Sequence, residues 1–174
     1  MMTTKQDPPV TEYDAVLIGA GQANNPLARA LAQAGWRVAL VEREHVGGTC
    51  INEGCTPTKT MIASARAAHV VRRGESYGVQ TGSLTIDMTR VRERKRDIVE
   101  TFRSRNRQRL EATEGLDLLM GEGRLSDARS VEVLMNDGSK RHLRAKKVFI
   151  NTGQRPRRPN LPGLHEIPTL PSTS

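Results

Sequence analysis

A strand, a glycine-rich turn, a helix and a second strand follow one another within the first 42 residues of this 174-residue chain. Residues 13–18 form an apolar run typical of a buried parallel strand, and Gly19 and Gly21 follow at once in a tight turn. Apolar residues then recur at helical spacing until Gly35, before a second apolar run at residues 37–41. This order predicts a βαβ unit built around a parallel sheet.

Glu42 ends the second strand about 20 residues after the glycine turn, where dinucleotide folds place a carboxylate that binds ribose hydroxyls. The helix N-terminus of such a unit directs its free N–H groups at a pyrophosphate. Asn24 occupies the position of the third fingerprint glycine, so we expect it to shift the helix slightly outward and weaken pyrophosphate binding. Pro26 is tolerated if the helix starts near Ala23 or Asn24.

The only two cysteines, Cys50 and Cys55, lie in the glycine-containing segment 47–59. A distorted first helical turn can bring two sulfurs at this spacing into bonding distance, and a helix N-terminus stabilises a thiolate, so the pattern favours a redox disulfide. Three alternatives stay open. The pair could be a structural disulfide, which is uncommon in the cytosol. It could be half of a zinc site with only His45 nearby. It could also be two inert buried thiols.

Together these motifs resemble the pyridine nucleotide-disulfide oxidoreductases, flavoenzymes that include dihydrolipoamide dehydrogenase, glutathione reductase and mercuric reductase. The matching segments are Gly19-Ala20-Gly21, Glu42, residues 47–59 and residues 151–156. Residues 57–61 are most similar to the mercuric reductase branch. The resemblance implies an α/β fold, namely a Rossmann-like FAD-binding domain with a parallel sheet, helices and a small antiparallel β-meander.

The resemblance also implies FAD as the cofactor and gives the two cysteines separate roles. Cys50 matches the interchange thiol that attacks substrate, and Cys55 matches the thiol that contacts flavin. Lys59 matches the lysine near the flavin N5 region. No metal ligand is implied. The other cofactor-binding positions implied by the family are Gly19, Gly21, Glu42, Gly48, Thr49, Gly123, Thr152 and Gly153.

Beyond the cysteines, the sequence predicts two helices, at residues 58–72 and 87–112, and several later strands. The strands are expected at residues 116–120, 131–134, 142–143 and 147–150, with a turn at residues 136–138. We expect a disordered N-terminus at residues 1–11, an incomplete FAD-binding domain at residues 12–160 and a linker or tail at residues 161–174. The last four residues are expected to fray.

Basic charge is concentrated in the second of these helices, where the stretch between Arg90 and Leu110 contributes +6 of the net charge of +8. Clustered Lys and Arg can neutralise phosphates, so a basic nucleic-acid-binding domain is one alternative function. The chain has only five aromatic residues and none forms a base-stacking platform, which favours a solvated or partner-facing helix. No apolar run is long enough to span a membrane.

The expected function is that of the FAD-binding, redox-disulfide part of an NAD(P)H-dependent flavin-disulfide reductase. The chain is shorter than half of such an enzyme, and NAD(P)H would bind only the complete enzyme. We therefore expect inactivity in isolation and partners in the form of missing C-terminal domains or a homodimer partner, with a small-molecule substrate. No nucleic acid and no membrane are expected as partners, and no signal peptide is recognised, so the expected location is cytoplasmic. A flavin-binding module completed by another chain is the remaining alternative.

Overall fold

The computed structural model describes residues 9–170, which form two compact units. The first unit holds residues 9–48 and Arg105–Gln154, and the second holds Thr49–Ser104 and residues 155–170. Disorder was expected for residues 1–11, of which residues 1–8 lie outside the described residues, as do residues 171–174, which were expected to fray.

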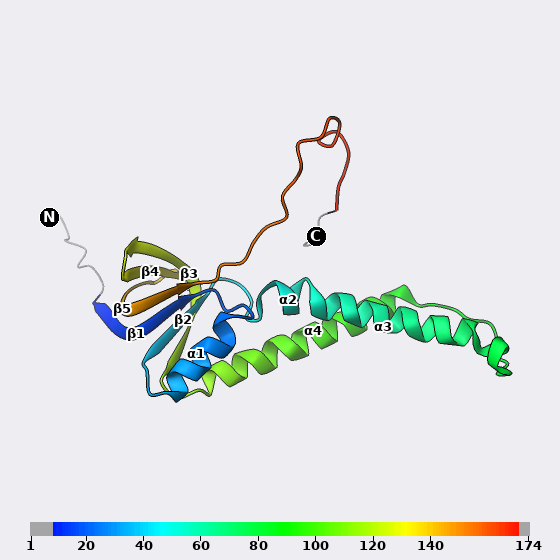
Figure 1. Cartoon of the computed structure of the whole chain (residues 1–174), viewed down its shortest axis with the longest axis horizontal. Helices are drawn as coiled ribbons and strands as arrows, with labels where there is room; N and C mark the ends of the chain where they lie inside the picture. Colours follow the sequence, from blue (N-terminus) through cyan, green and yellow to red (C-terminus); the bar gives the residue numbers. More distant parts are fainter. Residues whose placement is uncertain (1–8, 171–174) are drawn as a thin grey trace. The chain divides into compact units, whose positions relative to one another are not determined.

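Five strands of the first unit close into a ring in which every strand has two neighbours (Figure 1). β1 pairs in parallel with β2 and β5, and β2 pairs in parallel with the first part of β3. The second part of β3, β4 and the first part of β5 form an antiparallel meander, which confirms the expected α/β fold. The strands are β1 (Val10–Ile18), β2 (Val38–Glu42), β3 (Leu116–Asp127), β4 (Ser130–Met135) and β5 (Lys140–Ile150).

β5 is one continuous strand, although two short strands were expected at residues 142–143 and 147–150. It pairs with β4 at its beginning and with β1 from His142 to Ile150, so it belongs to both the meander and the parallel sheet. Exposed polar residues interrupt its apolar pattern, so the sequence did not indicate one continuous strand. The same pairing lengthens β1, because Val10 and Thr11 lie opposite His142 and Leu143, upstream of the domain start expected at residue 12.

Alternate residues of β1 and β2 face two different cores, as the pleat of a strand requires. One face packs in a buried cluster with α1 (Asn24–Gln33) and with Leu110 of α4 (Met88–Glu111). Its strand residues include Ala15, Leu17, Val38 and Leu40. The opposite face packs against the meander, and that cluster includes Val16, Ile18, Ala39, Val41, Val131, Val133 and Leu143. Burial on both faces explains why residues 15–18 of β1 and residues 38–41 of β2 are all apolar.

The second unit is mainly helical. α2 (Gly48–Asn52) starts at the boundary of the two units, and α3 (Cys55–Arg72) and the short 3₁₀ helix η1 (Gly74–Tyr77) follow. The first part of α4 then runs beside α3, held there by a hydrogen bond of 3.1 Å from Arg94 Nη1 to the Thr60 carbonyl (Figure 1). α3 begins three residues before the expected start at residue 58, because the Thr58 N–H already donates to the Gly54 carbonyl at 3.1 Å.

Candidate active site

The turn after β1 requires glycine at its first position. Gly19 has a φ of +91°, and a Cβ on it would overlap the Asn151 carbonyl oxygen and lie 2.9 Å from the Asn151 carbonyl carbon. The Gly19 N–H donates to the Val41 carbonyl at 2.8 Å, and the Asn151 N–H donates to the Ile18 carbonyl at 2.9 Å. The ends of β1, β2 and β5 therefore converge on this turn with no space for a side chain.

A second glycine segment packs on the same turn. Gly48 has a φ of +60°, and a Cβ on it would lie 2.9 Å from the Gly21 Cα. The Gly47 N–H donates to the Ala20 carbonyl at 2.8 Å, and Gln22 Nε2 donates to the Gly47 carbonyl at 3.0 Å. The two glycine segments thus present adjacent backbone free of side chains, which is the kind of surface that a pyrophosphate can approach closely.

Glu42 holds its carboxylate against the glycine turn. Its Oε2 accepts a hydrogen bond from the Ala20 N–H at 2.8 Å, and its Oε1 accepts one from the Glu44 N–H at 2.9 Å. A carboxylate offers about four acceptor positions, so two contacts fix its orientation and leave acceptor capacity for hydroxyl donors.

Asn24 is accommodated inside the fold. Its side chain is buried, and Nδ2 donates to the Ile18 carbonyl at 3.2 Å, so the amide binds the end of β1 at the position expected for a glycine. α1 begins at Asn24, which places Pro26 in the first turn as expected. The outward shift expected for this helix stays a prediction. The hydrogen bond to the Ile18 carbonyl was not predicted, because the sequence does not show which group a polar side chain at residue 24 contacts.

Three other predicted cofactor positions lie at strand ends or in the core. Gly153 has a φ of +76° and open space where a Cβ would point. Thr152 follows Asn151 at the convergence of strands, with its Cα 3.4 Å from the Cβ position of Gly19. A Cβ on Gly123 would point into the core, 3.2 Å from Val41 Cγ1, so packing is enough to explain that glycine.

The two cysteines lie on either side of a bend between α2 and α3. α2 ends at Asn52, and the Glu53 and Gly54 N–H groups both donate to the Thr49 carbonyl, at 2.9 and 2.6 Å. Gly54 has a φ of −112° and a ψ of −105°, and a Cβ on it would lie 3.0 Å from that carbonyl oxygen. Helical structure then resumes at Cys55.

This bend brings the two thiols together. Both cysteines are free thiols, with Cys50 half-buried and Cys55 exposed. A hydrogen bond with the Cys55 thiol, together with desolvation, raises the pKa of Cys50, and the positive charge of Lys59 acts in the opposite direction. The predicted pair is therefore assembled, with Lys59 one helical turn beyond Cys55.

Several features bear on the alternative functions. In α4 three arginines are already paired with glutamates of the same helix, Arg90 with Glu93, Arg103 with Glu100 and Arg107 with Glu111. Within residues 9–170 no group of three or more His, Cys, Asp or Glu side chains could hold a metal ion. No described helix is both long enough and apolar enough to cross a bilayer.

Comparison with known proteins gives consistent matches. The sequence profile of the pyridine nucleotide-disulphide oxidoreductase family matches residues 13–173. A mercuric reductase of Staphylococcus aureus is 33% identical over 163 residues, which cover 94% of this chain and 29% of that protein. A dihydrolipoyl dehydrogenase of Bacillus subtilis (strain 168) is 37% identical over 90 residues, which cover 52% of this chain and 19% of that protein.

Among solved structures, the Cu(II) complex of the HOCl-induced flavoprotein disulfide reductase RclA from Escherichia coli superposes with a TM-score of 0.72 and 34% identity. The match covers 91% of this chain and 32% of that one. A cysteine-to-serine mutant of the same protein gives a TM-score of 0.76 and 33% identity. The chain thus spans between 19% and 34% of the length of the relatives named here.

Proposed function

Because this chain belongs to the pyridine nucleotide-disulphide oxidoreductase family, we propose that it is the FAD-binding, redox-dithiol part of a flavin-disulfide reductase. The observation that carries the proposal is the bend between α2 and α3, which carries the free thiols of Cys50 and Cys55 on its two sides. Cys55 also raises the pKa of Cys50, so the two thiols interact, as a pair that cycles between dithiol and disulfide requires.

The residues of the first unit fit FAD. Gly19, Gly21 and Gly48 would hold its pyrophosphate, because all three are half-buried rather than buried and carry no side chain that would keep a phosphate from the backbone. Glu42 would accept hydrogen bonds from the ribose hydroxyls with its already oriented carboxylate. Bound FAD would supply two-electron redox chemistry. Further contacts are proposed for Thr49, Lys59, Gly123, Thr152 and Gly153.

The dithiol itself would carry the electrons. Closing the bond between the Cys50 and Cys55 sulfurs releases two electrons and two protons, and reopening it takes them up again. We assign substrate attack to Cys50 and the flavin contact to Cys55. The hydrogen bond with Cys55 raises the pKa of Cys50, and the positive charge of Lys59 would counteract this effect by favouring the Cys50 thiolate.

The complete enzyme would use NAD(P)H, and its C-terminal domains or a homodimer partner would supply the nicotinamide site and the proton-transfer groups. The substrate proposals are mercuric ion, lipoamide or another small disulfide. An NAD(P)H-consuming reaction of this kind would fit a cytoplasmic location.

Flavin retention tests the cofactor assignment. The chain is incubated with FAD and passed through gel filtration, and the flavin-to-protein ratio of the protein peak is read from absorbance. We expect about one FAD per chain, and a large loss in Gly48→Ala, where the new Cβ meets the Gly21 Cα. Gly138→Ala is the matched control, because Gly138 also has a positive φ but no neighbour within 4 Å. Equal retention by both variants would contradict the proposed pyrophosphate site.

A further inference from the structure

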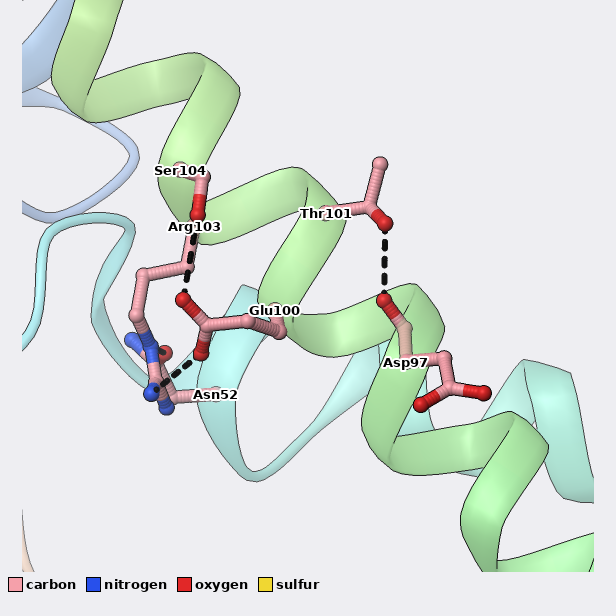
Figure 2. A network of polar contacts seen from close by, with 6 residues as sticks. All are labelled: Asn52, Asp97, Glu100, Thr101, Arg103 and Ser104. Atoms are coloured by element: carbon pink, nitrogen blue, oxygen red, sulfur yellow. Dashed lines mark hydrogen bonds and ion pairs between the residues drawn. The ribbon is translucent and has the colours of Figure 1, made fainter.

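Arg103 of α4 contacts the segment between the two cysteines. Its Nε donates to Asn52 Oδ1 at 3.0 Å (Figure 2). Asn52 is the last residue of α2, two positions after Cys50 and three before Cys55. The contact therefore joins α4 to the bend at the point where α2 ends.

The guanidinium of Arg103 is itself held in place. Its Nη1 donates to Glu100 Oε2 at 3.0 Å, and Ser104 Oγ donates to the other oxygen of Glu100 at 3.0 Å (Figure 2). The Arg103 side chain is 26% exposed, whereas that of Glu100 is 61% exposed. A planar guanidinium fixed on one edge by a carboxylate presents Nε to Asn52 with little remaining freedom.

α2 depends on such support. It has five residues, and a helix of that length has no stability of its own in water because nucleation is costly. The position of Cys50 is therefore set by what α2 contacts. On the other side of the bend, Cys55 belongs to the 18-residue α3, which Arg94 of α4 also contacts through the Thr60 carbonyl.

We propose that Arg103 is a positioning residue for the redox pair, which by its hydrogen bond to Asn52 keeps Cys50 within bonding distance of Cys55. The inference rests on the proposed redox role of the two cysteines. Without the contact, α2 gains freedom, the thiols spend less time together, and disulfide formation becomes less favourable.

The equilibrium with glutathione measures this effect directly. Two thiols of the chain and one glutathione disulfide give the Cys50–Cys55 bond and two glutathione thiols, so glutathione disulfide takes up the two electrons and two protons. The full chain is equilibrated over a series of glutathione ratios and its remaining thiols are alkylated and counted by mass spectrometry. For Arg103→Ala we expect the equilibrium constant to fall about tenfold, which corresponds to a reduction potential about 30 mV less negative.

Arg90→Ala is the matched control. Arg90 also lies on α4 and pairs with a glutamate three residues away, and its removal takes the same charge from the helix. We expect its equilibrium constant to stay within about twofold of that of the unchanged chain, since surface pairs of this kind contribute little. Arg103→Lys should resemble Arg103→Ala, because lysine keeps the charge but cannot donate from Nε while bound to Glu100.

Asn52→Ala combined with Arg103→Ala completes the test. If the two side chains act through their mutual hydrogen bond, the double variant should show no larger loss than either single variant. Equal equilibrium constants for Arg103→Ala, Arg103→Lys and Arg90→Ala would overturn the inference while leaving the redox pair intact. Failure of the unchanged chain to form the Cys50–Cys55 bond at any glutathione ratio would overturn the proposed function, and this inference with it.

Discussion

Gly19→Ala should be among the most destabilising single-methyl additions in this chain. The new Cβ would overlap the Asn151 carbonyl oxygen, so the ends of β1 and β5 would have to separate. Separation strains the hydrogen bond from the Asn151 N–H to the Ile18 carbonyl, which measures 2.9 Å. Gly138→Ala provides a reference, since Gly138 has a φ of +85° against +91° for Gly19 and open space around its Cβ position.

The two substitutions share one energetic cost and differ in another. An L-residue at positive φ costs about 1–2 kcal/mol, and the lower entropy of the unfolded alanine chain offsets about 0.4–1 kcal/mol of it. Gly138→Ala should therefore lower the free energy of unfolding by about 1 kcal/mol. Gly19→Ala adds about 1 kcal/mol for a weakened hydrogen bond and about 1–3 kcal/mol for backbone displacement in a packed region. In total, Gly19→Ala should lower the free energy of unfolding by about 3–5 kcal/mol.

Urea unfolding of the two variants and the unchanged chain, followed by circular dichroism at 25 °C, measures these free energies. The decisive quantity is the difference between the variants, from which the shared cost of positive φ cancels. We expect Gly19→Ala to be less stable than Gly138→Ala by about 2–4 kcal/mol. A difference below about 1 kcal/mol would refute the view that close approach of Asn151, rather than φ, requires glycine at residue 19.

Three further predictions follow from single contacts. Asn24→Ala should lower the free energy of unfolding by about 1 kcal/mol in the same urea assay, because the carbonyl at the end of β1 loses one of two donors. Stability should fall between pH 10 and 12, because burial and the hydrogen bond to Asp117 raise the pKa of Tyr13 to about 12, and the unfolded chain loses that proton first. Tyr13→Phe should remove this part of the pH dependence, and an unchanged slope would contradict the assignment. In Cys55→Ala, alkylation of Cys50 should begin at lower pH than in the reduced unchanged chain, because the hydrogen bond that raises its pKa is gone; peptide mapping after iodoacetamide treatment checks this.

Local patterns predicted the local parts of the fold. The strand, turn and helix around Gly19 and the charged helix at residues 88–111 follow from short-range apolar periodicity and glycine placement, and both were predicted from the sequence. The ring of strands was not, because its closure depends on pairing between residues about 130 positions apart, such as Val10 and His142. Exposed lysines and arginines in β5 also interrupt the apolar run that would have indicated one long strand.

The residues of the candidate site also include some that the sequence predicted and some that it did not. The two cysteines and the glycines were predicted because their residue types and spacing carry the chemistry. Arg103 was visible only as one of nine basic residues in a charged helix, and its hydrogen bond to Asn52, 51 positions away, has no sequence signature. The hydrogen bond from Asn24 to the Ile18 carbonyl was not predicted either. The sequence showed only that a glycine was missing, and it did not show that the side-chain amide of Asn24 would bind this carbonyl.

The closed ring of strands has a consequence for how this chain can meet other chains. An open sheet leaves a row of unpaired N–H and C=O groups along each outer strand, which can template pairing with a strand of another molecule. Among the described residues each of the five strands pairs with two others, but β3 pairs with β2 only through residues 116–120 and with β4 only from Gly121 onward, so each half of β3 keeps one edge without a strand partner. Closure of the ring therefore limits backbone pairing with a strand of another molecule to short segments, and pairing along a whole strand would first require the ring to open.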